Sequence, residues 1–301
     1  MRYEISRRIN LVLAKYLKVP RKLAQRIARG INFAMQPFAY GPRKAMAEKL
    51  TTTPASALHI DAQTAFCTSQ FDGIAEVEPA LVRAKEIYNA AREEQNLQRF
   101  KGGRSKKSFL MYASQSEQSA QYDELMRLAL ARPVLDAVAS YLGTMPILNS
   151  VNIMVSEPND SAQASQLYHL DFADIHQIKM FIAIEDVTDE HGPFTFVPSD
   201  KTRELIKKTN YDRGRLTIEQ VEEAVGADAQ VSLICKRGEG LLIDTSKCMH
   251  YGSKGNKYPR LMFQVQYTDY YVPESPPTRW PVKELTQKLG LDPVQVMALG
   301  G

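Results

Sequence analysis

The segment LYHLDFADIHQIKMF, residues 167–181, concentrates reactive side chains in a chain that has five histidines among its 301 residues. It holds His169, Asp171, Asp174 and His176 within eight positions, directly before an apolar run. Imidazole and carboxylate groups at this spacing could bind a metal ion, act as a general acid and base, or form a polar turn that leads into a strand. The remaining histidines help to decide between these three interpretations.

Two histidine–aspartate pairs compete within this segment. Residues two apart in a strand point to the same face, so His169 and Asp171 project side by side if residues 166–172 form a strand. Asp174 and His176 have the same spacing in reverse order, but they fall in an expected turn before the next strand. The first pair is therefore the preferred one, although a His-x-Asp motif taken alone is a weak signal and favours a structural hydrogen-bonded pair.

A third histidine, His250, lies in a short polar stretch between two expected strands, and Arg260 begins the second of them. Two histidines and one carboxylate can occupy one face of an octahedral ion and leave three positions open, as in the facial triad of non-haem iron oxygenases. His169, Asp171 and His250 would supply these ligands. An arginine can grip a carboxylate through two parallel hydrogen bonds, so Arg260 suits the far end of a co-substrate such as 2-oxoglutarate.

Several further segments occur in the same order as in a known enzyme family. They are QFDGIAEV (70–77), YHLD (168–171), HGPFTFVPSD (191–200), RGEGLLID (237–244) and HYGSKGN (250–256), followed by Arg260. Together they resemble the phytanoyl-CoA dioxygenase family of Fe(II)/2-oxoglutarate-dependent dioxygenases, and the resemblance covers about residues 57–275. The Pro-Gly-Ser-His sequence of the family is replaced here by Pro198-Ser199-Asp200, so the local turn must differ.

The resemblance implies an enzyme that uses Fe(2+), 2-oxoglutarate and O2 to oxidise a small-molecule substrate, most simply by hydroxylation. It assigns His169, Asp171 and His250 to catalysis and metal binding, and Arg260 to 2-oxoglutarate. Family members oxidise acyl-CoA thioesters, osmolytes and natural products, so the substrate itself is not specified. Two alternatives stay open: a non-enzymatic β-sandwich of the same fold, and an enzyme that uses Zn or Mn at the same ligands.

The other histidines have structural interpretations. His59 falls in an expected strand, which favours a core or edge position, and His191 precedes a Gly-Pro turn, which favours exposure. Two segments are candidates for substrate contact: the insertion at 200–229 and the basic loop at 101–108. The charges of that loop would suit an anionic substrate or simply face solvent.

The elements that must position these residues are mainly short strands in the second half of the chain. Apolar and β-branched runs are separated there by Gly, Pro, Asn and Asp, which is typical of an antiparallel sandwich or barrel. These runs lie at 147–157, 178–187, 193–199, 230–237, 240–246 and 260–272, after a first expected strand at 57–66. Helices are expected at about 79–96, 117–142 and 200–226, and Thr217 and Gln220 could form a capping box in the last. The predicted fold is mainly β with flanking helices (α+β), with a double-stranded β-helix (jelly roll, cupin-like) core.

Charge is distributed unevenly along the chain. The formal net charge is +4, but residues 1–50 carry 12 Lys+Arg and 2 Asp+Glu, hence +10, while residues 51–301 carry 26 and 32, hence −6. Apolar positions at helical spacing predict a first helix at 5–17, and Pro20 ends it and could open a second. We therefore divide the chain into a basic helical N-terminal extension, residues 1–50, and a dioxygenase-like domain, residues 51–301.

Two interpretations of the extension stay open. Its helices could dock on the main domain with a solvated basic side, or residues 1–35 could make peripheral membrane contact or meet an acidic partner. No nucleic-acid partner is expected, because aromatic residues do not alternate with the basic ones. No run approaches the roughly 18 apolar residues of a membrane span. Three widely spaced cysteines, Cys67, Cys235 and Cys248, suggest free thiols and hence a cytoplasmic location; the oligomeric state is not specified.

Overall fold

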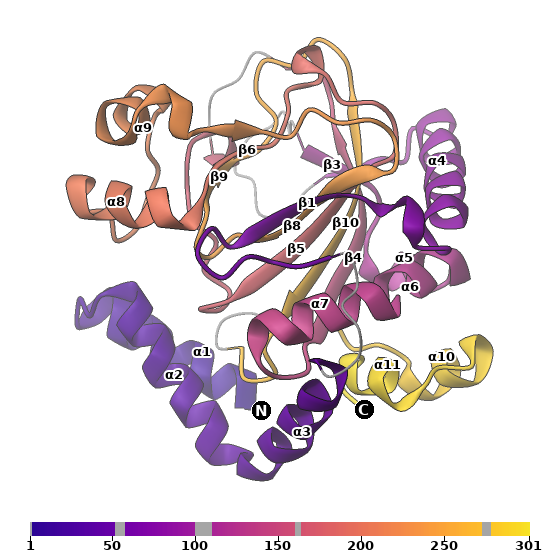
Figure 1. Cartoon of the computed structure of the whole chain (residues 1–301), viewed down its shortest axis with the longest axis horizontal. Helices are drawn as coiled ribbons and strands as arrows, with labels where there is room; N and C mark the ends of the chain where they lie inside the picture. The colour runs from indigo at the N-terminus through magenta and orange to yellow at the C-terminus, as the bar shows by residue number, and fades with distance from the viewer. Residues whose placement is uncertain (1, 52–57, 100–109, 160–163, 273–277) are drawn as a thin grey trace.

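Two antiparallel β-sheets stacked on each other form the centre of the computed structural model, which describes residues 2–51, 58–99, 110–159, 164–272 and 278–301 (Figure 1). Within these residues the larger sheet has seven strands in the order β1-β8-β5-β10-β4-β3-β2, and the smaller has three in the order β7-β6-β9. All the strand pairings are antiparallel. This arrangement confirms the predicted double-stranded β-helix core with flanking helices.

The strands of the larger sheet are β1 (Phe66–Gln70), β2 (Gln98–Arg99), β3 (Leu110–Ser114), β4 (Ile147–Ser156), β5 (Gln177–Ala183), β8 (Glu239–Asp244) and β10 (Arg260–Thr268). Those of the smaller sheet are β6 (Thr195–Val197), β7 (Val231–Ser232) and β9 (Met249–Tyr251). The strand expected at 57–66 was wrong in its position. Residues 62–64 form a turn, because the Asp61 carboxylate accepts hydrogen bonds from the Gln63 and Thr64 N–H groups, and β1 begins only at Phe66.

The helices are α1 (Arg2–Leu11), α2 (Arg21–Met35), α3 (Tyr40–Thr51), α4 (Val77–Glu93), α5 (Ser116–Ser119), α6 (Asp123–Ala129), α7 (Arg132–Leu142), α8 (Ser199–Thr209), α9 (Ile218–Val225), α10 (Val282–Leu289) and α11 (Pro293–Ala298). The single helix expected at 117–142 was wrong, since three helices, α5 to α7, occupy this stretch. Pro133 explains the last break, because it lacks an N–H group and therefore suits the first turn of a new helix. Within the described parts of the chain, no helix combines the length and apolar character that a membrane span requires.

The two faces of the larger sheet differ in character. Along β10, Leu261, Phe263 and Val265 pack on one face into the main hydrophobic core, together with α4, α6 and α7. The alternate residues face the smaller sheet, and among them Met262 joins a second, smaller core. Arg260 and Gln264 share this inner face, so polar side chains are directed into the space between the sheets.

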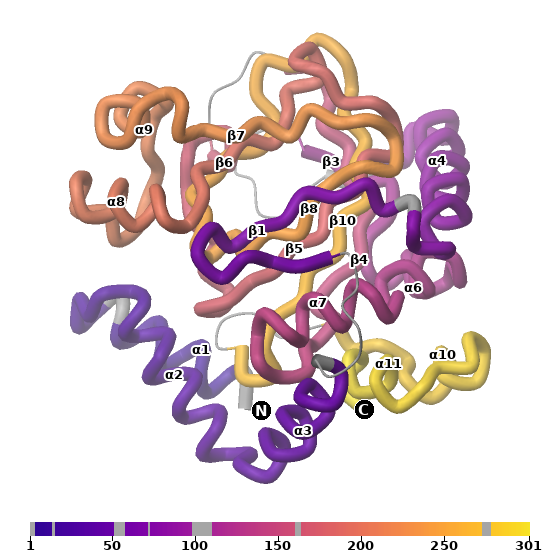
Figure 2. The backbone as a smooth tube through the Cα atoms, viewed as in Figure 1, coloured from indigo at the N-terminus to yellow at the C-terminus, as the bar shows by residue number. Residues whose placement is uncertain are grey.

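Two helical segments border the sandwich on one side (Figure 2). The insertion predicted at about 200–226 contains α8 and α9, and the Thr217–Gln220 capping box at the start of α9 is present. The N-terminal helix α2 lies against the domain, where the Gln25 amide donates to the Phe172 carbonyl at 2.6 Å. The domain boundary at residue 50 stays a prediction.

Candidate metal centre and co-substrate site

His169 and His250 are brought together by backbone pairing. The His169 N–H donates to the His250 carbonyl and the His250 N–H to the His169 carbonyl, each at 2.9 Å. His250 lies on β9, but the regular strand expected at 166–172 was wrong, because only isolated bridges form at Tyr168 and His169. This short pairing nevertheless places both imidazoles on the same side of the segment as Asp171.

Three side chains converge at this point. His169 Nε2 lies 3.9 Å from Asp171 Oδ1, and His250 Nε2 lies 3.6 Å from Asp171 Oδ2. One ligand atom from each residue lies within 4.8 Å of the others, and no other such group of three occurs among the described residues. Two imidazole nitrogens and one carboxylate at this separation form a donor set that fits a divalent transition metal.

Backbone carbonyl groups orient both imidazoles. His169 Nδ1 lies 2.9 Å from the Leu167 carbonyl, and His250 Nδ1 lies 2.9 Å from the Cys248 carbonyl. A carbonyl oxygen can only accept, so each Nδ1 carries the proton and donates it. Each Nε2 therefore presents a lone pair toward Asp171, which is the orientation that a metal ligand needs.

Burial and neighbouring charges favour the ligating protonation states. Burial, aided by the nearby His250, lowers the pKa of His169 to about 3, and burial lowers the pKa of His250 as well. Burial alone would raise the pKa of Asp171, but the Lys179 ammonium and the two histidines hold it below its usual value. At neutral pH the three side chains are thus two neutral imidazoles and one carboxylate.

Lys179 and Gln177, which the sequence motifs did not single out, also contact Asp171. Lys179 Nζ lies 2.6 Å from Asp171 Oδ2, and Gln177 Nε2 donates to the same oxygen at 3.4 Å. Both residues lie on β5 at alternate positions and therefore face the interior of the sandwich. The sequence signal for Lys179 was its position as a lysine inside an otherwise apolar strand.

Arg260 is buried without a carboxylate partner among the described residues. Its guanidinium donates to the Gly192 carbonyl at 2.5 Å and to Ser156 Oγ at 3.4 Å, and its Nε has no hydrogen-bond partner in the described part of the chain. Burial lowers the pKa of Arg260 to about 10, because no neighbouring carboxylate among these residues offsets the loss of water. An uncompensated cation with a free donor fits an anionic ligand such as a carboxylate.

Arg260 on β10 and His250 on β9 lie in opposing sheets, so the expectation that they occupy adjoining strands was wrong. One segment links them across the sandwich. The carbonyl of Gly192 accepts the bond from Arg260, and four residues later Phe196 pairs with His250. The Phe194 ring, between these two positions, lies 5.3 Å from the His250 ring, measured between centroids. The segment that begins at Gly192 therefore contacts both halves of the site.

Amide side chains line the inner face next to Asp171. The Gln177 amide donates to Gln266 at 3.0 Å, and Gln266 donates to Asn149 at 3.1 Å. On the same face, the Asn152 amide donates to Gln264 at 2.7 Å. These residues alternate with apolar ones along β4, β5 and β10, and they make this end of the interior polar.

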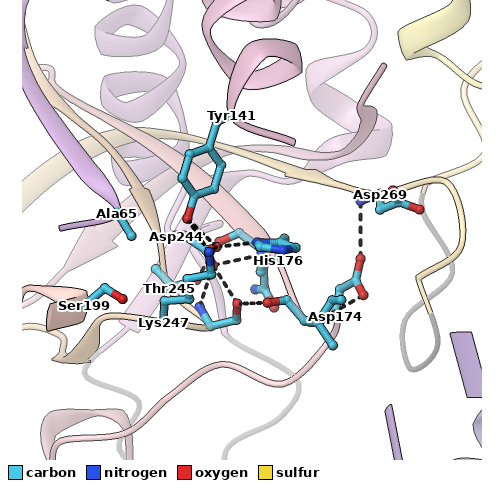
Figure 3. A network of polar contacts seen from close by, with 12 residues as sticks. Ala65, Tyr141, Asp174, His176, Ser199, Asp244, Thr245, Lys247 and Asp269 are labelled. Atoms are coloured by element: carbon cyan, nitrogen blue, oxygen red, sulfur yellow. Dashed lines mark hydrogen bonds and ion pairs between the residues drawn. The ribbon is translucent and has the colours of Figure 1, made fainter. Parts of the chain in front are cut away.

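The competing pair makes other contacts (Figure 3). Asp174 is buried, and one of its oxygens lies 3.3 Å from the Arg29 guanidinium of α2. His176 Nδ1 lies 2.9 Å from Asp244 Oδ2, and the Tyr141 hydroxyl donates to the same oxygen at 3.0 Å. Both residues are thus engaged in structural contacts and are absent from the converging group.

The two remaining histidines are absent from the converging group. The strand position expected for His59 was wrong, because His59 is exposed in a segment without regular structure between buried Leu58 and Ile60. Half-buried His191 accepts a hydrogen bond from the Thr188 N–H, within the turn expected there. The loop at 101–108 lies outside the described residues. The insertion with α8 and α9 packs through Leu205, Leu216 and Val221 against Tyr168, Leu170 and Met249, which are neighbours of the converging residues in the chain.

A small cleft borders the converging group at Asp171. It has a volume of about 120 Å³, and Asp171, Phe172 and His176 line it together with Lys22 and Arg26 of α2. A larger cavity of about 370 Å³ is lined by residues such as Glu78 and Arg237 and includes no member of the converging group. Of these two, the smaller cleft is the one that contacts the converging group, through Asp171.

Comparison with known proteins is consistent with this site. The model of the Phytanoyl-CoA dioxygenase (PhyH) family matches residues 69–257, a range that contains His169, Asp171 and His250. No curated protein matches the chain in sequence.

Several solved structures are similar in fold. The crystal structure of SnoN, a non-heme alpha ketoglutarate dependent epimerase from nogalamycin biosynthesis, is 18% identical over 75% of this chain and 84% of its own, with a TM-score of 0.51. The apoform of EctD from S. alaskensis is 17% identical over 76% and 84% of the two chains, again with a TM-score of 0.51. A structure of EctD with bound Fe is 15% identical over 72% and 79%, with the same TM-score. At these identities the likeness shows the fold alone.

Proposed function

The chain belongs to the phytanoyl-CoA dioxygenase family of non-haem iron and 2-oxoglutarate-dependent enzymes, and from this premise we propose that His169, Asp171 and His250 hold the iron. The observation that carries the proposal is their convergence, with both Nε2 atoms turned toward one carboxylate by backbone carbonyl groups. A non-enzymatic sandwich would have no need to desolvate this donor set, since buried carboxylates and imidazoles are costly unless they are paired.

Arg260 is the proposed partner of 2-oxoglutarate. Its guanidinium is held by the Gly192 carbonyl and Ser156, both neutral, so its charge remains available to the distal carboxylate of the co-substrate. The Nε, unpartnered among the described residues, supports this assignment, because a bidentate carboxylate would satisfy it.

Iron together with 2-oxoglutarate and O2 supplies the oxidation, with succinate and CO2 as co-products, and the proposed outcome is hydroxylation of a small molecule. The chain contributes position and exclusion of water. Phe194 packs beside His250 next to the smaller sheet. The amides of Gln177, Gln264 and Gln266 offer hydrogen-bonding groups on the inner face of the larger sheet. A cytoplasmic location, supported by three free cysteines, also stays a proposal.

The test replaces Arg260. We expect Arg260→Leu to weaken 2-oxoglutarate binding by about 30-fold or more, because truncating one partner of a buried charged pair typically costs about 2–5 kcal/mol. Iron content should stay unchanged, because Arg260 is not one of the three converging ligands. The measurements are 2-oxoglutarate titration, iron content after anaerobic purification, and succinate release.

Arg237→Leu is the matched control, since Arg237 is an exposed arginine that pairs with Glu78. Unchanged 2-oxoglutarate affinity in Arg260→Leu would remove the co-substrate assignment. Zinc or manganese in place of iron, without succinate formation by the wild type, would favour the alternative metal enzyme.

A further inference from the structure

The N-terminal helices turn their apolar side chains toward solvent. Fourteen large hydrophobic residues are exposed among the described residues, and eleven of them lie between residues 5 and 40. These eleven, which we call the N-terminal apolar surface, are Ile5, Leu11, Val12, Tyr16, Leu17, Leu23, Ile27, Phe33, Met35, Phe38 and Tyr40. Single exposed hydrophobic residues are ordinary, but such a concentration marks an interaction site.

The orientation of α2 is the reverse of that of an ordinary surface helix. A helix with an apolar stripe normally packs the stripe on the core. Here α2 buries the small and polar residues Ala24, Gln25 and Ala28, while Leu23 and Ile27 are 49% and 40% exposed. The apolar stripe is therefore left for another partner.

Specific contacts hold α2 in this orientation. The Gln25 amide donates to the Phe172 carbonyl at 2.6 Å. The Arg29 guanidinium lies 2.7 Å from Asp269 and 3.3 Å from Asp174. The Asn32 amide donates to two consecutive backbone carbonyls at 3.2 and 3.1 Å. A helix rotated to bury Leu23 and Ile27 would lose all these bonds, so the outward face is a defined feature of the fold.

The first helix follows the same pattern. In α1 the polar residues Ser6 and Asn10 are buried, whereas Ile5 and, just after the helix, Val12 are exposed. Positions 5 and 12 are seven residues apart, so they lie on one face of a helix. Both helices therefore present apolar residues to solvent and polar residues to the protein.

Charge identifies the partner. Residues 1–40 contain nine Lys+Arg and one Glu, which gives +8. A second copy of the chain would bring an equal positive charge to the same place, and like charges disfavour that contact. Apolar side chains combined with excess Lys and Arg are instead the composition of helices that lie in the interface of an anionic membrane.

We propose that residues 2–40 dock this protein on an anionic lipid surface, with the N-terminal apolar surface at the boundary between headgroups and acyl chains. The exposed basic residues Arg7, Arg8 and Lys18 of the same segment then lie near the lipid phosphates and carboxylates, whereas Arg29 stays paired with Asp174 and Asp269. Because α2 also contributes Lys22 and Arg26 to the cleft beside Asp171, the docking helix forms one wall of that cleft. The inference does not depend on the proposed function, because it concerns binding in the absence of turnover.

The experiment measures sedimentation of the full-length protein with vesicles of phosphatidylserine and phosphatidylcholine. We expect binding at about 0.05 M salt, loss at about 0.5 M salt because ions screen the attraction, and no binding to phosphatidylcholine alone. The double variant Leu23→Ser with Ile27→Ser should bind about tenfold or more weakly, because two apolar side chains leave the interface.

The matched control is Val82→Ser with Ile234→Ser, since these residues are similarly exposed, at 45% and 53%, outside the N-terminal segment. It should bind as the wild type does. All four residues are exposed, so thermal unfolding should be unchanged in both double variants. Absence of vesicle binding by the wild type, or equal loss in the two double variants, would overturn the proposal. Concentration-dependent dimers that disappear only in Leu23→Ser with Ile27→Ser would identify a second copy as the partner and would also overturn it.

Discussion

Lys179 Nζ lies 2.6 Å from Asp171 Oδ2, so the acidic member of the candidate metal centre is paired with an ammonium group from the facing strand. Both side chains are largely withdrawn from solvent, with 19% and 20% of their surface exposed. A carboxylate in such a place requires a positive partner, because water no longer stabilises its charge. In the presence of a metal ion, the same carboxylate has a second partner.

The first prediction concerns this pair. Lys179→Met should lower the free energy of unfolding of the metal-free protein by about 1–3 kcal/mol, because it leaves a largely buried carboxylate without its cation. Bound metal should reduce this difference by supplying a substitute charge. Chemical unfolding with and without Fe(2+) measures both effects. Lys236→Met is the control, since Lys236 pairs with Asp186 at the surface and its loss should be small in both conditions; an equal loss in both variants would contradict the prediction.

The second prediction separates the two histidine–aspartate pairs. His169→Ala and Asp171→Ala should each abolish stoichiometric iron binding, because only two of the three converging ligands remain. His176→Ala should retain iron, because His176 contacts Asp244 and not the metal group. Iron content by elemental analysis after anaerobic loading gives the answer. Equal loss of iron in all three variants would show that the ligands are misassigned.

The third prediction concerns pH. Burial, opposed by Arg29 and aided by Asp269, raises the pKa of Asp174 to about 7. The stability that this residue contributes is therefore present in full below the pKa of an unfolded aspartate, about 3.8, and is lost as the pH rises through about 7. Asp174→Asn cannot ionise, so it should gain stability relative to the wild type between pH 5 and pH 8, by about 2–3 kcal/mol. Urea unfolding at the two pH values tests this, and a difference that does not change with pH would refute it.

The fourth prediction concerns the turn that holds Arg260. Gly192 has a φ of +60°, and a Cβ placed there would lie 2.9 Å from Asn256 Cβ and from Ser253 Oγ. Gly192→Ala should therefore destabilise the protein by about 1–3 kcal/mol and also weaken 2-oxoglutarate binding, because the carbonyl that positions Arg260 must move.

Gly255→Ala provides the control for this substitution. Gly255 has a φ of +63°, but a Cβ added there would meet no described atom within 4 Å, so only the backbone strain applies. We expect a loss of about 1 kcal/mol and unchanged 2-oxoglutarate affinity. Thermal unfolding and 2-oxoglutarate titration of both variants distinguish the two effects. Equal behaviour of the two variants would mean that the crowding at Gly192 has no role.

The sequence by itself determined the fold class, and it predicted the four residues on which the proposed chemistry depends. Side-chain type and a spacing of two selected His169 and Asp171, and the order of the later motifs pointed to His250 and Arg260. The choice of His169 and Asp171 rests on a local property, because residues two apart share a side over even a short extended stretch. The same local signals placed the capping box at Thr217 correctly. They failed at 117–142, where Pro133 and its neighbours divide one apolar pattern into separate helices.

The tertiary structure alone decided which residues surround these four. Lys179 reaches Asp171 only because β5 faces the segment that carries the ligands, and Gly192 supports Arg260 only because its turn crosses between the two sheets. The orientation of α2 was also beyond the sequence, since an apolar stripe indicates which face is hydrophobic but not whether the domain will cover it. In this chain the hydrogen bonds of Gln25 and Asn32 and the ion pairs of Arg29 set the rotation of the helix, and the apolar stripe faces outward as a result.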